Sequence, residues 1–335
     1  MKAQAPAFWQ ARGAIAQLLR PLSWLFGALA ARRRAAIQPQ RLPVPVIVVG
    51  NIAVGGSGKT PVVDWLAALL RAAGRRPGIV SRGHGARISA EGGVAVVPAD
   101  GDPDRYGDEP VLLARLTGCP LAIGRDRPAA ARELLRLHPD CDVLIADDGM
   151  QHYKLARDLE VAVVDESTLG NQLLLPAGPL REPLARLAEV DLILAHGPLS
   201  PTLSAATASV PVFPMQLQGG DLRALTDPAR TRPAADFRGR RVHAVAGIGR
   251  PQRFFEQLAG EGIDVVPHPF PDHHRFVADD LVFGDALPIL MTAKDAVKCW
   301  AFAPADCWEY PVRAQIGSGA AERILEKLED GRTTA

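Results

Sequence analysis

The sequence predicts an α/β protein with a mostly parallel, doubly wound sheet, a smaller C-terminal α/β domain and an N-terminal amphipathic helical segment. Two observations predict the large sheet: apolar, β-branched runs alternate with helical patterns up to about residue 197, and a glycine-rich turn follows the first run. A third is a stretch rich in Pro, Ser and Thr at 197–210, which is typical of a boundary. We therefore expect a helical segment at 1–40, a phosphate-binding domain at 41–200 and a second domain at 201–335.

The composition is that of an ordinary globular protein. Its formal net charge is only +1, which gives no sign of bulk binding to nucleic acid, and we expect no nucleic-acid partner. The four cysteines form no C-x-x-C pair, so neither a zinc knuckle nor a redox couple is indicated. We expect reduced thiols in a cytosolic compartment.

The first 40 residues resemble a helix that lies on a membrane surface. Apolar positions recur at helical spacing, aromatic residues flank them and arginines follow: Phe8, Ile15, Leu18, Leu22, Leu25 and Leu29, with Trp9, Trp24 and Phe26, then Arg32, Arg33 and Arg34. No stretch reaches the roughly 18 uninterrupted apolar residues that span a bilayer. Pro21 should kink or divide this helix. A core-packing helix is the alternative, and a signal peptide is disfavoured because the basic cluster follows the apolar stretch.

The elements of the first domain follow in order. A buried strand is expected at Val46 to Val49, and a helix with Pro61 in its first turn ends at Gly74. Further strands are expected at 77–81, 94–97, 120–124, 142–147, 161–165 and 190–195, with helices at 108–118 and 128–138 between them. After the boundary, extended segments at 211–217 and 222–225 precede a strand at 240–249, a helix at 251–262 and a strand at 263–270.

The glycine-rich turn predicts a nucleotide phosphate site. AVGGSGKT stands between a strand and a helix, so its backbone N–H groups and the helix N-terminus can converge on phosphate oxygens. Lys59 would contact the β- and γ-phosphates and the Thr60 hydroxyl would bind Mg²⁺. The candidate cofactor-binding residues are Ala53, Val54, Gly55, Gly56, Ser57, Gly58, Lys59 and Thr60.

The same loop narrows the class of protein. The P-loop consensus has glycine where this chain has Ala53. DNA-partitioning ATPases carry an additional lysine where this chain has Val54, and the N-K-x-D motif of GTPases is missing, since the TAKD segment from Thr292 to Asp295 has the wrong spacing. Both absences favour a small-molecule kinase over a nucleotide switch.

Acidic residues and histidines form further candidate sites. Asp147 and Asp148 end an apolar strand, where a P-loop enzyme holds its Mg²⁺, although Asp-Gly also favours a turn. Asp108 begins a predicted helix and is either an N-cap or a catalytic base, and the residues alone leave both open. The remaining candidates are of two kinds. One is a histidine paired with a carboxylate, with a metal site as the alternative, among His268, Asp272, His273 and His274. The other is a set of arginines that could bind phosphate, with surface salt bridges as the alternative: Arg82, Arg125 and Arg127.

Together these motifs resemble the tetraacyldisaccharide 4'-kinase family, the lipid A 4'-kinases. AVGGSGKT, SRGHG, GDEP, DRPAAA, DDGMQH, LLPAGPLREP and FPDHH follow one another over nearly the whole chain, and it is their order that is specific. The family often has tyrosine at the position of His84 and phenylalanine at that of Met150. These departures concern substrate packing and not the reaction.

The resemblance implies an ATP- and Mg²⁺-dependent kinase that phosphorylates the 4'-hydroxyl of a tetraacylated glucosamine disaccharide 1-phosphate. The lipid A precursor would be met at the cytoplasmic face of a Gram-negative inner membrane, to which the protein binds peripherally or monotopically. Asp108 matches the family's base and His273 its partner, acting with Lys59. Residues expected to line the cleft around substrate or nucleotide are Arg127, Gln151, His152, Arg181 and Glu182.

Two further expectations concern the whole molecule. Because Asp108 and His273 fall in different predicted domains, we expect the cleft to close before they meet. The alternative function is a nucleotide-switch or chaperone-type ATPase that acts on a protein partner.

Overall fold

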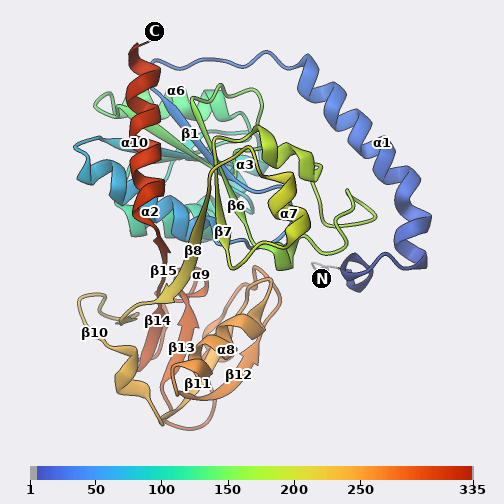
Figure 1. Ribbon diagram of the computed structural model, residues 1–335. Helices are drawn as coiled ribbons and strands as arrows, with labels where there is room; N and C mark the ends of the chain where they lie inside the picture. Colours follow the sequence, from blue (N-terminus) through green and yellow to red (C-terminus); the bar gives the residue numbers. More distant parts are fainter. Residues whose placement is uncertain (1–5, 334–335) are drawn as a thin grey trace.

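The structure, a computed structural model, describes residues 6–333 and places a large mixed sheet above a smaller one (Figure 1). In this described part the large sheet has nine strands in the order β15-β8-β7-β6-β1-β5-β2-β4-β3. Neighbouring strands are parallel except at the edges, where β15 and β3 run antiparallel. The strands are β1 (Val46–Gly50), β2 (Pro77–Ser81), β3 (Ala95–Val96), β4 (Leu121–Ile123), β5 (Val143–Asp147), β6 (Leu159–Val164), β7 (Leu192–His196), β8 (Val212–Gly219) and β15 (Val312–Ile316).

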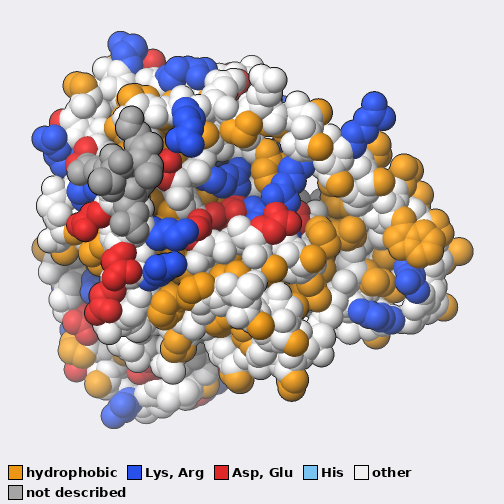
Figure 2. All heavy atoms as spheres, turned by 45° about the horizontal axis from the view of Figure 1, so that its top comes forward, with side chains coloured by type: hydrophobic (Ala, Val, Ile, Leu, Met, Phe, Trp, Pro, Cys, Tyr) orange, Lys and Arg blue, Asp and Glu red, His pale blue; other side chains and the backbone are white. Residues whose placement is uncertain are grey.

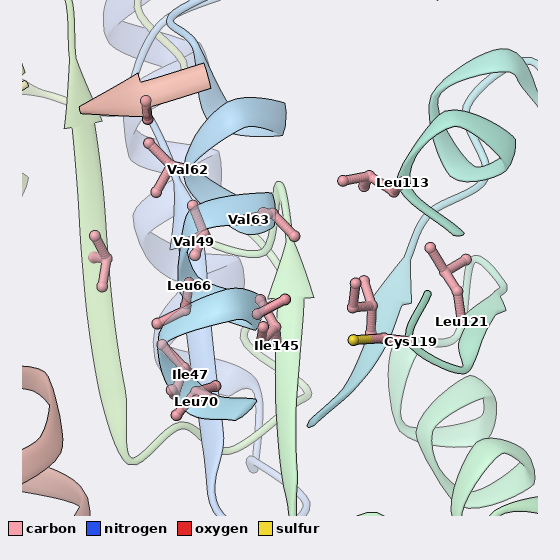
Figure 3. Close-up of a cluster of buried hydrophobic side chains, with 14 of the residues drawn as sticks. Ile47, Val49, Val62, Val63, Leu66, Leu70, Leu113, Cys119, Leu121 and Ile145 are labelled. Carbon is pink, nitrogen blue, oxygen red and sulfur yellow. The ribbon is translucent and has the colours of Figure 1, made fainter. Parts of the chain in front are cut away.

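Helices cover both faces of this sheet, as the unbroken apolar strands require. On one face Ile47 and Val49 of β1 pack with α2 (Lys59–Ala72), α5 (Asp108–Thr117) and α10 (Ser318–Thr333), and Figure 3 shows the centre of this cluster. On the other face Val46 and Val48 pack with α6 (Arg127–Leu137), α7 (Pro201–Ala206) and the 3₁₀ helix η3 (Leu184–Glu189). The smaller helices α3 (Arg87–Ala90) and α4 (Pro103–Tyr106) lie on the segment between β2 and α5. The predicted doubly wound α/β sheet is confirmed.

The smaller sheet is formed by residues 222–310, which are only part of the range that the sequence assigned to the second domain. In the described chain it has six strands in the order β10-β9-β14-β13-β11-β12. These are β9 (Leu222–Ala224), β10 (Thr231–Arg232), β11 (Arg241–Ala246), β12 (Asp264–Pro269), β13 (Ile289–Thr292) and β14 (Cys307–Tyr310), accompanied by α8 (Pro251–Gly260), α9 (Ala293–Ala296) and the 3₁₀ helices η4 (Ala234–Phe237) and η5 (Ala278–Leu281).

The division between the two sheets differs from the expected boundary at residue 200. β8 pairs with β7 in parallel, so the Pro/Ser/Thr-rich stretch before it is a crossover within the large sheet, and part of it forms α7. The chain returns from the small sheet through β15, and α10 then packs on the large sheet. The small sheet is therefore inserted between two elements of the large one. A polar connection between parallel strands has the same composition as an interdomain linker, which is why the sequence misplaced this boundary.

The N-terminal segment forms η1 (Ala7–Gln10) and one long helix, α1 (Ala14–Ala36), beside the large domain (Figure 1). The helix runs through Pro21 without being divided, and Pro21 lies on its exposed side, where the carbonyl group that loses its partner is accessible. The sequence analysis found no uninterrupted apolar run long enough to span a bilayer. Judged by length and composition alone, however, α1 is long and apolar enough to cross a membrane.

Candidate active site

The P-loop joins β1 to α2 at the centre of the large sheet. Gly55 has φ +122° and Gly58 has φ +86°, a conformation that side chains disfavour, and α2 begins directly afterwards at Lys59. Ser57 is buried and its Oγ accepts a 3.1 Å hydrogen bond from Asn51 Nδ2. Val54, Gly55 and Gly56 are exposed, but the Val54 N–H donates to the Pro179 carbonyl at 2.9 Å, so it is the N–H groups of Gly55 and Gly56 that are available to a ligand.

Ala53, which departs from the P-loop consensus, has a structural explanation. It is buried and forms a β-bridge with Leu180, and its φ is not in the left-handed region. Glycine is therefore not required there, because the backbone is already extended and paired.

Asp147 lies next to the P-loop because β5 pairs with β1 in the register Val49 to Asp147. Its carboxylate is buried and accepts a 3.0 Å hydrogen bond from Ser81 Oγ. Burial, and then the neighbouring charges of Asp148 and Glu109, raise the pKa of Asp147 to about 6. A buried carboxylate whose pKa is raised in this way is stabilised when a cation binds next to it.

The residues near Asp147 fit the Mg²⁺ that the sequence implied. Among the described residues, no group of three or more His, Cys, Asp or Glu side chains is arranged so that it could hold a metal ion. A P-loop enzyme does not need one, because its Mg²⁺ takes few protein ligands besides phosphate oxygens and water. Thr60, in the first turn of α2, and Asp147 supply such a hydroxyl and carboxylate.

Asp148 pairs with two cations instead. Lys59 Nζ lies 3.4 Å from Asp148 Oδ1, and Arg181 Nη1 lies 3.0 Å from Oδ2 and 3.2 Å from Gln151 Oε1. Burial would raise the pKa of Asp148, but Lys59 and Arg181 bring it well below its usual range. The predicted residues Lys59, Asp148, Gln151 and Arg181 are thus brought together in one charged group.

Arg127 is buried at the end of β5. Its Nη2 donates to the backbone carbonyl of Asp147 at 3.0 Å, while burial lowers its pKa to about 10, so it stays charged at neutral pH. Burial, followed by the charges of Arg127 and Arg82, lowers the pKa of His152 to about 3, which leaves that imidazole neutral. Arg82 itself is exposed just beyond β2.

Glu182 lies apart from this group. It accepts a hydrogen bond from the Tyr153 hydroxyl, and Arg186 Nε lies 3.2 Å from its Oε2 in a buried network. These contacts suit a residue that holds its own segment of the chain, just before η3, in place.

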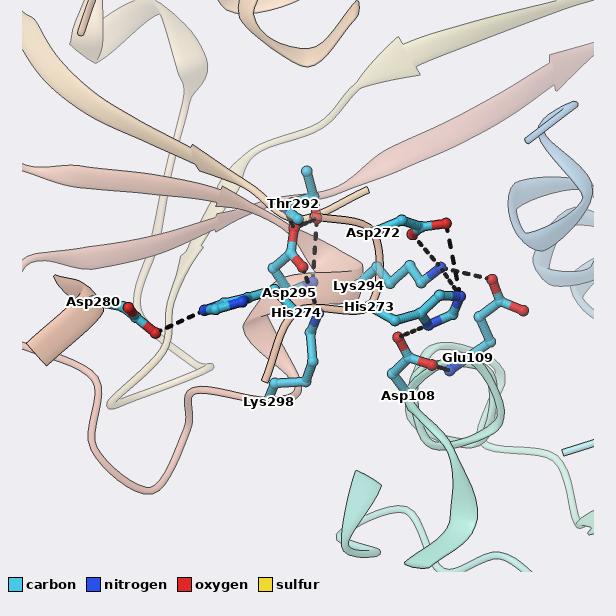
Figure 4. A network of polar contacts seen from close by, with 11 residues as sticks. Asp108, Glu109, Asp272, His273, His274, Asp280, Thr292, Lys294, Asp295 and Lys298 are labelled. Carbon is cyan, nitrogen blue, oxygen red and sulfur yellow. Dashed lines mark hydrogen bonds and ion pairs between the residues drawn. The ribbon is translucent and has the colours of Figure 1, made fainter. Parts of the chain in front are cut away.

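Asp108 and His273 meet across the two sheets (Figure 4). His273 Nδ1 lies 2.8 Å from Asp108 Oδ2. Asp108 is the first residue of α5, and its N-cap is Gly107, with no side-chain cap hydrogen bond. The helix-cap alternative for Asp108 is therefore wrong. The expectation that the cleft must close before the pair forms is also wrong for this structure, because the two side chains are already within hydrogen-bonding distance.

Lys294, which the sequence analysis passed over as part of TAKD, completes this cluster (Figure 4). Its Nζ lies 2.9 Å from Glu109 Oε1, 3.4 Å from His273 Nε2 and 3.5 Å from Asp272 Oδ1. Burial would lower the pKa of Lys294, but Glu109, Asp108 and Asp272 raise it above its usual range. The sequence did contain a signal for Lys294, because it directly follows a short apolar run, and strand ends in α/β proteins carry functional side chains.

The short helix α9 holds Lys294 in place. Thr292 caps α9, and the fully buried Asp295 accepts hydrogen bonds from Thr292 Oγ1 at 2.6 Å and from the backbone of Gly247 at 2.8 Å. The Gly247 carbonyl in turn accepts a bond from the His273 backbone. His268 and His274 lie elsewhere, paired with His243 and Asp280 respectively. Arg125 is exposed beyond β4.

A P-loop beside a buried aspartate, facing an Asp–His pair, defines a phosphotransferase of the P-loop class. Residues 15–329 match the family model described as tetraacyldisaccharide-1-P 4'-kinase. The chain therefore belongs to this family, as the order of its motifs predicts.

Related proteins agree over the full length. The chain is 65% identical to the tetraacyldisaccharide 4'-kinase of Azoarcus sp. (strain BH72), covering 99% of this chain and 97% of that protein. It is 63% identical to that of Aromatoleum aromaticum, covering 100% of both. The crystal structure of LpxK from Aquifex aeolicus in complex with ATP has a TM-score of 0.77 at 28% identity, covering 94% of this chain and 99% of that one. The chain is thus an ATP-dependent kinase of lipid A biosynthesis, and the comparisons favour this over the switch ATPase.

The position of Lys59 yields a prediction. Replacing Lys59 with alanine should lower kcat by roughly 10²- to 10³-fold, the usual loss for a group that stabilises developing charge, because no other lysine stands at the start of α2. The melting temperature should hardly change. Lys154→Ala, at an exposed position, is the control. Normal turnover in a folded Lys59→Ala variant would contradict the assignment.

Proposed function

We propose that this chain transfers the γ-phosphate of ATP to the 4'-hydroxyl of a tetraacylated glucosamine disaccharide 1-phosphate, with Mg²⁺, at the cytoplasmic face of the inner membrane. The observation that supports the proposal is the contact at the start of α5 between Asp108 and His273 of the small domain, which we propose to be the base and its partner. Glu109, next to Asp108, is close enough to raise the pKa of Asp147, so this base and the P-loop share one electrostatic environment.

Asp108 is the proton acceptor in this proposal. Burial would raise the pKa of Asp108, but the hydrogen bond from His273 and the charge of Lys294 lower it to about 2, so the carboxylate stays ionised at neutral pH. Such a group is a weak base. A weak base is sufficient, because the transition state of phosphoryl transfer is loose and demands little added charge on the acceptor oxygen.

His273 holds this carboxylate in position. The ammonium group of Lys294 is a donor next to Nε2, which favours the tautomer with the hydrogen on Nδ1, donated to Asp108 Oδ2. Asp108 Oδ1 receives only a 3.1 Å contact from the backbone of Glu109, so it is the oxygen that can accept the hydroxyl proton.

The P-loop and its neighbours bind the nucleotide in this proposal. The exposed backbone of Gly55 and Gly56, together with Lys59, would hold the triphosphate, and Thr60 and Asp147 would hold Mg²⁺, which neutralises phosphate charge when bound. Arg82 and Arg181 add positive charge at the rim of the proposed site, where they could bind the lipid phosphate or the nucleotide.

Helix α1 would seat the enzyme on the membrane. Most of its large apolar side chains are exposed: Ile15, Leu18, Leu22, Trp24, Leu25 and Leu29. Hydrophobic side chains gather on the projecting part of the molecule in the space-filling view, with arginines and lysines nearby (Figure 2). An exposed apolar surface of this kind favours a lipid environment, which also contains the acylated substrate.

The Asp108–His273 pair can be tested as a unit. Asp108→Ala and His273→Ala should each lower kcat by about 10²- to 10⁴-fold, as is typical of general acid–base groups, with ATP affinity little changed. The double variant should be hardly worse than the more damaged single one, because the residues act together. The neighbouring His274→Ala is the control, since His274 pairs with Asp280 instead. Losses that multiply would disprove the pair.

The metal assignment can be tested separately. Asp147→Asn should weaken the apparent Mg²⁺ affinity by at least about tenfold, because even indirect partners of metal ligands contribute that much. Titrating activity with Mg²⁺ at saturating ATP measures this shift. Asp140→Asn, at an exposed position, is the control. An unchanged Mg²⁺ titration would place the metal on other residues.

The membrane role of α1 predicts an effect on binding to vesicles. Replacing both Leu18 and Leu25 with serine should reduce co-sedimentation with anionic phospholipid vesicles by tenfold or more. Each leucine side chain that becomes buried in the membrane contributes roughly 1.5–3 kcal/mol to binding. Both side chains are more than half exposed, so the melting temperature should not fall. Leu137→Ser on α6 is the matched control. Undiminished sedimentation would mean that another surface binds the membrane.

A further inference from the structure

Helix α1 has a second face, made of small residues, that packs on the protein. Ala16 and Ser23 are its buried residues, and Gly27 follows one turn after Ser23. A Cβ at Gly27 would lie 2.8 Å from Leu174 Cδ1, so a larger residue would force either the Leu174 side chain or the helix to shift. The apolar face of α1 is thus free for lipid, while the opposite face is fitted to the segment around Leu174.

That segment, residues 171–181, is here called the connecting loop. Ser23 Oγ donates to the Leu174 carbonyl at 2.8 Å and accepts from the Ala177 backbone at 3.1 Å. At its start, the buried Asn171 side chain donates to the carbonyls of Phe8, Ala11 and Ala177. The polar groups of the loop therefore depend on the N-terminal segment for their partners.

The other end of the connecting loop holds the P-loop. The Val54 backbone donates to the Pro179 carbonyl at 2.9 Å, and the Arg181 backbone donates to the Ile52 carbonyl at 2.7 Å. Leu180 forms the β-bridge with Ala53. Arg181 also carries the side chain that pairs with Asp148, the partner of Lys59.

Between these ends the connecting loop is tightly packed. Leu180 donates to the Leu173 carbonyl, and Leu175 donates to that of Leu180. A Cβ at Gly178 would lie 2.2 Å from Asn171 Oδ1, so the loop folds directly onto the side chain that anchors the N-terminal segment. These hydrogen bonds and this close packing connect the end of the loop at Asn171 to the end at Arg181, so we expect a displacement at one end to affect the other.

We propose that α1 positions the P-loop through the connecting loop, and that Ser23 and Asn171 are positioning residues for ATP binding. Docking of α1 orders the loop that fixes Ile52, Ala53 and Val54, so the nucleotide meets a P-loop whose backbone is already in place. The inference rests on the proposed nucleotide role of the P-loop and is independent of the proposed membrane role of α1. The helix thus has two separable tasks on its two faces.

The test uses full-length variants and equilibrium dialysis with ATP and Mg²⁺ in the absence of vesicles and lipid substrate. Ser23→Ala and Asn171→Ala should raise the Kd for ATP by about 3- to 30-fold, the range expected when one to several hydrogen bonds to the loop are lost. Ser23→Thr, which keeps the hydroxyl, should restore most of the affinity. With saturating ATP and substrate, kcat should change much less than Kd.

The face of α1 that carries Leu18 and Leu25 provides the converse arm. The Leu18→Ser, Leu25→Ser double variant should lose vesicle binding with its Kd for ATP unchanged, whereas Ser23→Ala should keep vesicle binding. If Ser23→Ala and Asn171→Ala lower only the melting temperature, or only vesicle binding, and leave the Kd for ATP unaltered, the inference is overturned. If instead ATP fails to bind the unmodified protein, it is the proposed nucleotide site that has failed.

Discussion

Two adjacent carboxylates at the carboxyl end of β5, Asp147 and Asp148, must be stabilised next to a triphosphate that is itself strongly negative. Bringing like charges together inside a protein is costly unless cations are fixed beside them. The structure supplies Lys59 and Arg181 to Asp148 and leaves Asp147 with a raised pKa, facing the P-loop. The two carboxylates thus differ: Asp148 is paired with the P-loop lysine, whereas Asp147 has no such ion pair among the described residues and is the one proposed to hold Mg²⁺.

The small sheet extends this charge balance to the acceptor side. Its loops bring His273 and Lys294 to the N-terminus of α5, where the buried Asp108 contacts His273 and the partly exposed Glu109 contacts Lys294. A helix N-terminus also stabilises negative charge, so the ionised form of Asp108 is favoured for two independent reasons. Because the small sheet is inserted before β15 and α10, the chain is tied to the large sheet on both sides of the insertion, which limits how far the base can move from the P-loop.

The N-terminal helix α1, which exposes a row of apolar side chains, is linked to the same centre. Its small-residue face and its apolar face are both readable as helical periodicities, but they serve different partners. The connecting loop, which begins at Asn171 and ends at the P-loop, is where the helix meets the catalytic domain. If both proposals for α1 hold, the element that meets the lipid also supports the nucleotide site, which suits an enzyme that acts on an acylated substrate.

The sequence by itself determined the local features. The alternation of apolar strands with helices predicted the doubly wound sheet, and the glycines of AVGGSGKT, of which Gly55 and Gly58 adopt positive φ, located the P-loop. Only the tertiary structure decided the pairings between distant segments: Asp108 with His273, 165 residues later, Lys294 with Glu109, and Ser23 with Leu174. The residues alone left Asp108 open between base and helix cap, and they placed the domain boundary before β8. The reason is physical: backbone conformation and burial periodicity are encoded within a few residues, whereas contacts between elements depend on how whole sheets and helices pack.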